Sequence, residues 1–289
     1  MVYDLIIIGG GQSALACAYF LRRAELNYLL LDDQEEPGGA WLHSWNSLTL
    51  FSPSEYSSLP GWLMPKSGNK FLTRNEVISY LQQYEERYHF PIKRPVHVHQ
   101  VIREEDNFML QTDAGNYRAK TIISATGTWQ KTFVPAVAGK DTYKGLQLHS
   151  AAYKEPKPFA GKKVLIVGEG NSGAQILAEV SQVAHTTWAT RKEPAYLPDD
   201  VDGRVLFDVA SAKYYAEKEG KTFNSENFSL GNIVMVPPVK AARERKVLQA
   251  VRTFKMLDEG GAVWPDGNRE DFDAIIWCTG FRFALDLFS

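Results

Sequence analysis

The chain has 289 residues, a formal net charge of -2 at pH 7, 44% hydrophobic residues and 23% charged residues. This balance fits a globular protein of one or two domains and gives no reason to expect a nucleic-acid partner. The two cysteines, Cys17 and Cys278, provide neither a CxxC redox pair nor a metal cluster, and they fit a reducing cytoplasm. The apolar run Leu5–Ile8 is too short for a signal core or a membrane span, so we expect a cytoplasmic protein without membrane contact.

A glycine-rich turn lies between the first expected strand, at residues 2–8, and an expected helix at residues 12–24. The turn fits the pattern GxGxxA. Gly9 permits the tight bend, Gly11 lets the backbone approach a pyrophosphate, and Ala14 is small enough for the helix to pack on the strand. Amides at the start of the helix would face the phosphates. The pattern predicts a dinucleotide site, and the alternative is a glycine turn without a ligand.

Two further features support a dinucleotide near this turn. The second expected strand, Tyr28–Leu31, ends at Asp32, whose carboxylate can accept hydrogen bonds from ribose hydroxyls. Farther on, Gly38 and Gly39 precede Trp41. That pattern fits a backbone passing close to a flat ligand, and it fits an ordinary turn before a buried tryptophan equally well.

The next part of the chain is expected to hold packing elements. Apolar spacing at residues 74–88 predicts an amphipathic helix, and residues 96–118 predict two or three short antiparallel strands. A short strand at residues 121–124 then leads into Ala125 and the pair Thr126-Gly127.

Two polar clusters could suggest a metal ion. His97 and His99 would share one strand face, but without a third ligand in view a solvated face is favoured. Asp199–Gly203 resembles the start of a calcium loop, yet Val209 and Ala210 stand where its closing glutamate should fall. We therefore predict a polar loop there and no metal site in the chain.

A second glycine-rich turn follows a strand expected at residues 164–167, and it is a complete GxGxxG. A helix at residues 172–183 and a strand at residues 185–189 complete the unit. This strand ends at Arg191 and Lys192, which suit an adenosine 2′-phosphate; the alternative is a pair of solvated cations. The cofactor contacts expected of the turn come from Gly168, Gly170, Asn171, Ser172 and Gly173.

The later part of the chain repeats the pattern of the first unit. The remaining expected elements are two helices, at residues 204–221 and 239–251, and three short strands, at residues 251–256, 262–264 and 272–277. The last strand leads into Cys278-Thr279-Gly280, as the earlier one leads into Ala125-Thr126-Gly127. Each nucleotide unit is thus expected to end on a strand with a T-G exit.

A motif between the two turns identifies a family. Tyr143-x-Gly145-xxx-His149-xxx-Tyr153 resembles FxGxxxHxxx(Y/W/F), the mark of the single-component (class B) flavoprotein monooxygenases. These include the flavin-containing and the Baeyer-Villiger monooxygenases. Tyrosine stands here where the family has phenylalanine. Together with the two fingerprints and the T-G exits, the resemblance covers essentially the whole chain, and it is closest to a short bacterial subgroup.

The resemblance implies an α/β fold of two Rossmann-like dinucleotide-binding domains, with the NADP domain inserted in the FAD domain. The first FAD segment would span residues 1–153 and the NAD(P) domain residues 154–280. Residues 281–289 would begin the returning FAD segment. The expected FAD contacts come from Gly9, Gly11, Ala14, Asp32, Gly39, Trp41, Thr126 and Gly127.

The resemblance also implies a reaction. NADPH, or NADH as the second option, would reduce the flavin, and O2 would then form a C4a-(hydro)peroxyflavin that oxygenates a sulfide, an amine or a ketone. Gly145, His149 and Tyr153 would shape the joint between the domains rather than act as acid and base. Arg191 falls where the family places its arginine for the 2′-phosphate, and Lys192 stands where many relatives carry threonine. The partners would be O2 and a small molecule, and a homodimer is compatible with the sequence.

Family members continue beyond the last T-G exit with a strand and a helix that face the flavin, whereas this sequence stops at Ser289. We therefore expect the chain to bind FAD weakly and to release H2O2 as a leaky NADPH oxidase. Two alternatives stay open at this point. One is an NAD(P)H-dependent flavin reductase or oxidase without oxygenation, and the other is an inactive nucleotide-binding remnant.

Overall fold

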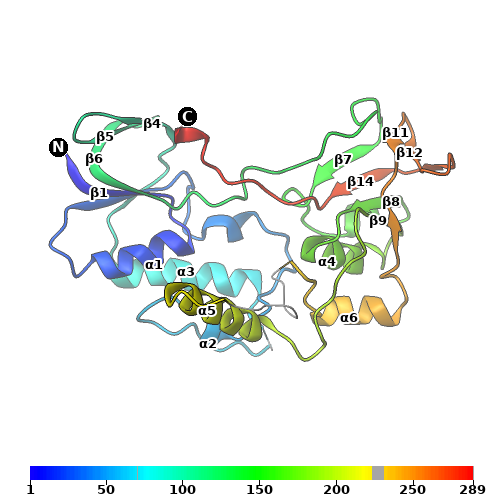
Figure 1. Cartoon of the computed structure of the whole chain (residues 1–289), viewed down its shortest axis with the longest axis horizontal. Coiled ribbons are helices and arrows are strands. Elements are labelled where there is room, and N and C mark those ends of the chain that lie inside the picture. Colours follow the sequence, from blue (N-terminus) through cyan, green and yellow to red (C-terminus); the bar gives the residue numbers. More distant parts are fainter. Residues whose placement is uncertain (70, 223–230, 289) are drawn as a thin grey trace.

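The computed structural model describes residues 1–69, 71–222 and 231–288. It contains two α/β units that lie side by side (Figure 1). We call the six-stranded sheet and its helices the first unit, and the five-stranded sheet and its helices the second unit. The predicted fold class, two Rossmann-like units in one chain, is confirmed.

The first unit has the strand order β3-β2-β1-β6-β5-β4. Strands β1, β2, β3 and the second half of β6 are parallel, whereas β4, β5 and the first half of β6 form an antiparallel meander. Helices α1 and α3 lie together on one side of the sheet (Figure 1). The bounds are β1 (Tyr3–Ile8), α1 (Gln12–Leu21), β2 (Tyr28–Leu31), η1 (Gly39–His43), α2 (Ser54–Ser57), α3 (Arg74–Tyr88), β3 (Ile92–Lys93), β4 (Val98–Arg103), β5 (Phe108–Thr112) and β6 (Gly115–Ser124).

Strand β6 differs from the prediction, which divided it into two strands. Its first residues pair antiparallel with β5, and from Ala119 onward it pairs parallel with β1. One strand therefore joins the meander to the nucleotide-binding half of the sheet. A local pattern cannot show this, because the partner strand changes while the backbone stays extended.

The second unit has a fully parallel sheet in the order β10-β9-β8-β14-β7, beside a small antiparallel sheet of β11, β12 and β13. Helices α4 and α6 lie on one side of the parallel sheet (Figure 1). The bounds are β7 (Leu146–His149), η2 (Lys157–Phe159), β8 (Lys163–Val167), α4 (Asn171–Val180), β9 (His185–Thr190), α6 (Pro237–Glu244), β10 (Ala250–Arg252), β11 (Met256–Leu257), β12 (Gly261–Val263), β13 (Arg269–Asp271) and β14 (Ala274–Trp277). Two later elements contact the first unit: α5 (Gly203–Lys218), beside α2, and η3 (Asp286–Phe288).

The chain crosses between the units twice. Strand β7 lies within the segment that we assigned to the first domain, residues 1–153, yet it is the edge strand of the second sheet. The sheet pairing thus puts the first crossing before Leu146. After β14 the chain runs back to the first unit, where η3 packs against β4 (Figure 1).

The predicted helix at residues 239–251 is shorter and begins earlier. Helix α6 starts at Pro237, because proline lacks only an N–H that has no partner in a first helical turn. It ends at Glu244, and Lys246 adopts a positive φ of 61°. The chain can then turn into β10, which pairs parallel with β9.

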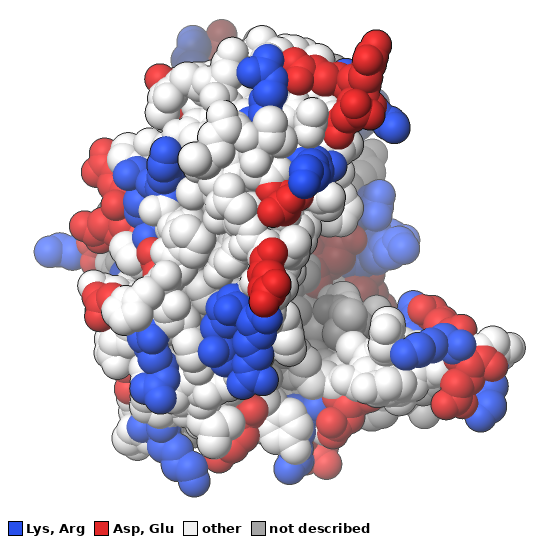
Figure 2. All heavy atoms as spheres, turned by 90° about the vertical axis from the view of Figure 1, so that its left-hand side faces the viewer, with Lys and Arg blue, Asp and Glu red and all other residues white. Residues whose placement is uncertain are grey.

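Each unit has its own apolar core around its central strands. Ile6 and Ile7 of β1, and Leu165 and Ile166 of β8, are fully buried. Basic and acidic side chains are interspersed over the outer face of the first unit (Figure 2). Among the described residues, no helix combines the length and the apolar character that crossing a bilayer requires.

Candidate active site

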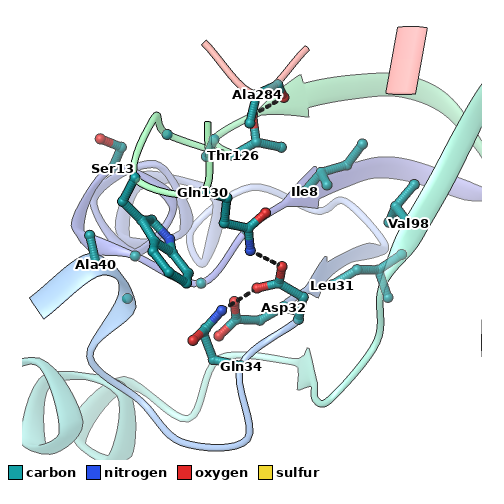
Figure 3. A pocket seen from close by; sticks show the side chains of 18 of the residues that line it. Ile8, Ser13, Leu31, Asp32, Gln34, Ala40, Val98, Thr126, Gln130 and Ala284 are labelled. Carbon is teal, nitrogen blue, oxygen red and sulfur yellow. Dashed lines mark hydrogen bonds between the residues drawn. The ribbon is translucent and has the colours of Figure 1, made fainter. Parts of the chain in front are cut away.

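A cavity of about 420 Å³ lies at the carboxyl ends of β1, β2 and β6 (Figure 3). Loops from neighbouring parallel strands diverge at this edge, which is where open α/β sheets bind nucleotides. Ala14 is fully buried beneath the turn and does not line the cavity. Seven of the eight predicted FAD-binding residues do line it: Gly9, Gly11, Asp32, Gly39, Trp41, Thr126 and Gly127.

The two outer glycines of the first turn have different tasks. Gly9 has a φ of 114°, and a Cβ atom there would lie 2.5 Å from the Ala125 carbonyl oxygen, so the strand exit requires glycine. Gly11 has extended backbone with a φ of -78°. A Cβ atom at Gly11 would meet only the Gly39 Cα, at 3.9 Å. Gly11 thus leaves open space in the cavity, as a pyrophosphate cradle requires.

Asp32 is buried and bound by an arginine that no sequence motif indicates. Arg94 donates to Asp32 Oδ2 from Nη2 at 2.9 Å and from Nε at 3.1 Å, and its Nη1 donates to Glu85 Oε1. Burial raises the pKa of Asp32, and Arg94 opposes that rise. A Cβ atom at Gly10 would lie 2.3 Å from Asp32 Oδ2. Gly10 is therefore needed to bring the turn against this ion pair.

The open side of the cavity is bordered by the residues after β2 and β6 and by the C-terminal segment. Gln34 and Gln130 point toward the acids at the end of β2 (Figure 3), and both donate to Asp33. Thr126 Oγ1 donates to the Ala284 carbonyl at 2.8 Å, and the Ala284 amide donates to the Gly127 carbonyl. The returning segment thus forms part of the cavity wall.

The second turn repeats this arrangement after β8. Gly168 has a φ of 130°, and a Cβ atom there would lie 2.2 Å from the Cys278 carbonyl oxygen. A Cβ atom at Gly173 would lie 2.3 Å from the Gly168 carbonyl oxygen. At Gly170, in contrast, a Cβ atom would meet nothing within 4 Å. Gly170 is therefore the glycine that leaves room for a ligand.

Other predicted residues around the second turn contribute in different ways. The Asn171 side chain bonds backbone groups of Asn232 and Val234, so its amide holds the neighbouring loop. Arg191 and Lys192 are exposed after β9. The Arg191 amide donates to the Glu169 carboxylate at 3.4 Å, which places an acid near the two cations.

The family motif forms the joint between the units. His149 Nε2 donates to the Gly280 carbonyl at 3.0 Å, and its Nδ1 accepts from the Ala151 amide at 3.1 Å. These two bonds fix the neutral tautomer, and burial lowers the pKa of His149. Tyr143 donates to the Phe272 carbonyl, and its hydroxyl oxygen would lie 2.2 Å from a Cβ atom at Gly145. Glycine is thus required because the tyrosine folds over it.

Tyr153 links the joint to helix α4. Its buried hydroxyl donates to Glu179 Oε2 at 2.9 Å, and Ser47 of the first unit donates to the other oxygen of the same carboxylate. Lys154 Nζ donates to the His43 carbonyl at the end of η1. These bonds set the position of the second unit against the loop that follows Gly39.

A second cavity, of about 220 Å³, lies between the units next to the first. The two cavities share Ala40, Trp41 and Trp129. Ser172 of the second turn and Ser150 of the joint also line it. A molecule in this cavity would therefore contact both nucleotide sites.

The comparisons with known proteins identify the family. The family described as pyridine nucleotide-disulphide oxidoreductase matches residues 6–206. The chain belongs to this family. The structure of a flavin-containing monooxygenase from Stenotrophomonas maltophilia is similar to it, with 48% identity, a TM-score of 0.90, and coverage of 100% of this chain and 82% of that one.

Two sequence relatives agree with this placement. Uncharacterized oxidoreductase CzcO of Bacillus velezensis is 30% identical over 98% of this chain and 83% of its own length. Senecionine N-oxygenase of Tyria jacobaeae is 25% identical over 96% of this chain and 58% of its own length. The predicted class, a flavin-dependent monooxygenase that uses FAD and NADP(H), is confirmed.

The remaining polar clusters of this oxidoreductase have structural partners. The His97 and His99 rings contact each other at 4.8 Å, and the described residues contain no cluster that could hold a metal ion. In the predicted polar loop, Asp199 pairs with Arg243 and Asp202 caps α5. The thiol of Cys278 is buried, which raises its pKa.

Proposed function

We propose that the monooxygenase holds FAD in the first cavity, with the pyrophosphate over Gly11 and the adenosine ribose at Asp32. The observation that carries this proposal is the open space in front of Gly11 inside the cavity. At Gly9, in contrast, a Cβ atom would collide with the backbone of Ala125. Arg94 holds Oδ2 of Asp32 and the Gln34 amide also bonds this carboxylate, so a ribose hydroxyl would use its remaining acceptor capacity. The first-turn amides of α1 would stabilise the phosphate charge.

NADPH would bind at the second turn, with its pyrophosphate over Gly170. Arg191 and Lys192 lie after β9, where a dinucleotide fold places the adenosine ribose. Their charges support a 2′-phosphate, and Glu169 beside Arg191 works against it. NADPH is therefore the proposed donor, and NADH stays the second option.

FAD, when bound, supplies the redox chemistry and the activation of O2. The residues of the chain bind and orient. Trp41 and Trp129 line both cavities, so they form a boundary that the two sites share. The Nε2–H group of His149 is already engaged in a hydrogen bond to the Gly280 carbonyl, so we assign His149 a positioning role at the joint.

The substrate would be a small molecule with a nucleophilic sulfur or nitrogen, or a ketone, in the second cavity. The relative named senecionine N-oxygenase supports the nitrogen option, since its name describes oxygenation at nitrogen. A homodimer and a cytoplasmic location stay predictions of the sequence.

The proposal is tested with purified protein and added FAD. We expect a bound-flavin spectrum at high FAD concentration and NADPH-dependent conversion of methyl phenyl sulfide to its sulfoxide. H2O2 should form beside the sulfoxide, because the sequence predicts weak FAD binding and leaky turnover. H2O2 and sulfoxide formed per NADPH consumed are measured together. Absence of a bound-flavin spectrum in the presence of excess FAD would contradict the cofactor assignment. NADPH consumption that yields H2O2 and no oxygenated product would contradict oxygenation.

A further inference from the structure

The second cavity has an aromatic and almost entirely apolar lining. Three tryptophans, Trp41, Trp45 and Trp129, contribute to its walls together with Phe281. The His43 ring stacks on Trp129 with centroids 3.7 Å apart and an interplanar angle of 7°. Leu48, three serines and two alanines complete the lining, and no charged side chain of the described residues belongs to it. A guest would therefore contact ring faces rather than ionic groups.

Two cations lie behind the wall that η1 forms. Lys154 Nζ donates to the His43 carbonyl at 2.5 Å, and Arg74 Nη2 donates to the Leu42 carbonyl at 2.7 Å. Burial lowers the pKa of His43, the two cations add to this effect, and Asp33 opposes it. The field behind the His43 imidazole is therefore positive, and it disfavours the protonated form of the ring.

Two carboxylates around this cavity, Asp33 near His43 and Glu179 beside Tyr153, do not line it. Asp33 accepts from Gln34 and Gln130 at the first cavity, and Glu179 accepts from Ser47 and Tyr153 behind the joint. A protonated amine that enters the second cavity would lose its hydration without gaining a carboxylate partner. Burial of a charge without such a partner is strongly unfavourable. Aromatic rings attract cations, but Lys154 and Arg74 oppose that attraction here.

We propose that the second cavity selects small uncharged substrates, thioethers or ketones with apolar substituents, and rejects protonated and quaternary amines. The inference rests on the proposed function, because it takes this cavity as the substrate site. Of the sulfur compounds, amines and ketones of that proposal, it retains the uncharged ones and excludes amines that carry a positive charge. The cavity, at about 220 Å³, is small among ligand sites, and its volume favours a guest about as large as a single substituted ring.

The test uses two ligands of the same shape and different charge, 3,3-dimethyl-1-butanol and choline. Neither contains a thioether or a ketone, so binding is measured without turnover, by calorimetry and by tryptophan fluorescence. We expect the neutral alcohol to bind at least tenfold more tightly than choline. Equal or tighter binding of choline, or no binding of either ligand, would overturn the proposal.

Two variants locate the effect. Trp45→Leu removes a ring that lines only the second cavity, and we expect it to weaken binding of the alcohol at least threefold; unchanged binding would show that the ligand lies elsewhere. Lys154→Met should reduce the preference for the neutral alcohol over choline from tenfold to about threefold. Both Lys154 and Lys157 are exposed and lie outside the cavity lining, but only Lys154 donates to η1. The control is therefore Lys157→Met, which removes the same charge from a lysine that does not bond η1. A preference that changes equally in both lysine variants would contradict a local field.

The same titrations are run with and without added FAD. A protein that does not bind FAD would contradict the proposed function, while the charge preference of the cavity could still be read. Conversely, a protein that oxygenates methyl phenyl sulfide but binds choline as tightly as the alcohol would retain its proposed function and lose this inference.

Discussion

The two glycine-rich turns are the same device at two sites, and their differences separate what the fold needs from what the ligand needs. Gly9 and Gly168 both have a positive φ and both lie against the carbonyl of a strand exit. Gly11 and Gly170 both face open space. The turns differ at the third position, where Ala14 is tolerated but Gly173 is required by the close Gly168 carbonyl. The first glycine of each turn therefore serves the backbone, and the second serves the cofactor.

The strand ends that follow the turns also differ. Asp32 is buried and paired with Arg94, whereas Arg191 and Lys192 are exposed. The first site is thus built into the core of its unit, while the second presents its charges to solvent. Changes at the first strand end should affect folding and FAD binding together, and changes at the second should affect binding alone.

The largest expected effect comes from Gly168→Ala, with Gly9→Ala as its counterpart. Both changes combine a left-handed backbone with a clash against backbone, so we expect about 4 kcal/mol of lost stability in each. Chemical denaturation measures it. The matched controls are Gly11→Ala and Gly170→Ala, which should stay within about 0.5 kcal/mol of the parent. Equal losses in all four variants would remove the distinction between the two glycines.

A somewhat smaller loss is expected for Arg94→Met. The substitution leaves the Asp32 carboxylate buried without its cation, which costs about 3 kcal/mol, and FAD binding should weaken with it. Arg118→Met is the control, because its pair with Glu104 is exposed, where solvent screening leaves an ion pair little effect on stability. If the two variants unfold at the same denaturant concentration, the Asp32–Arg94 pair has no special role.

Gly11→Val and Gly170→Val should leave the fold intact and each remove one cofactor. The valine side chain of the first would occupy the proposed FAD pyrophosphate site, and that of the second the proposed NADPH pyrophosphate site. We expect Kd for the affected cofactor to rise at least roughly 100-fold, with the other cofactor unchanged. Flavin fluorescence and NADPH titration measure the two constants separately. If Gly11→Val lost NADPH binding and kept FAD binding, the two cofactors would have to be assigned to the opposite turns.

The smallest effect is expected at the exposed strand end. Arg191→Ala should raise KM for NADPH about tenfold and leave KM for NADH nearly unchanged, since a charge-assisted hydrogen bond to the 2′-phosphate contributes about 1.5–3 kcal/mol. Steady-state kinetics with both donors measures this, and Arg191→Ala combined with Lys192→Ala shows whether the lysine compensates. A matched rise for NADH would place Arg191 at another part of the cofactor or in the fold.

Much of the fold could be predicted from local patterns. Apolar runs that end in GxGxxA and GxGxxG indicated both strand–turn–helix units, because strand, glycines and helix lie in one continuous segment of the chain. The carbonyls that exclude a Cβ atom at Gly9 and Gly168 belong to distant residues, Ala125 and Cys278, and the pattern does not show them. The family motif and the T-G exits indicated the monooxygenase class. Helix α3 was also predictable, since its apolar spacing agrees with the capping box of Thr73 and Glu76.

Other features follow only from which segments meet in space. Arg94 reaches Asp32 because β3 pairs beside β2, and nothing in the residues around position 94 indicates that neighbour. Strand β7 belongs to the second sheet because it pairs with β14, more than 100 residues later in the chain. The aromatic cavity combines Trp45, Trp129 and Phe281 from three distant segments. The sequence by itself determined the two turns, since their glycine pattern lies within one continuous segment of the chain. The ion pair, the joint and the cavity between the units depended on tertiary packing, because each joins groups that are close only in the folded chain.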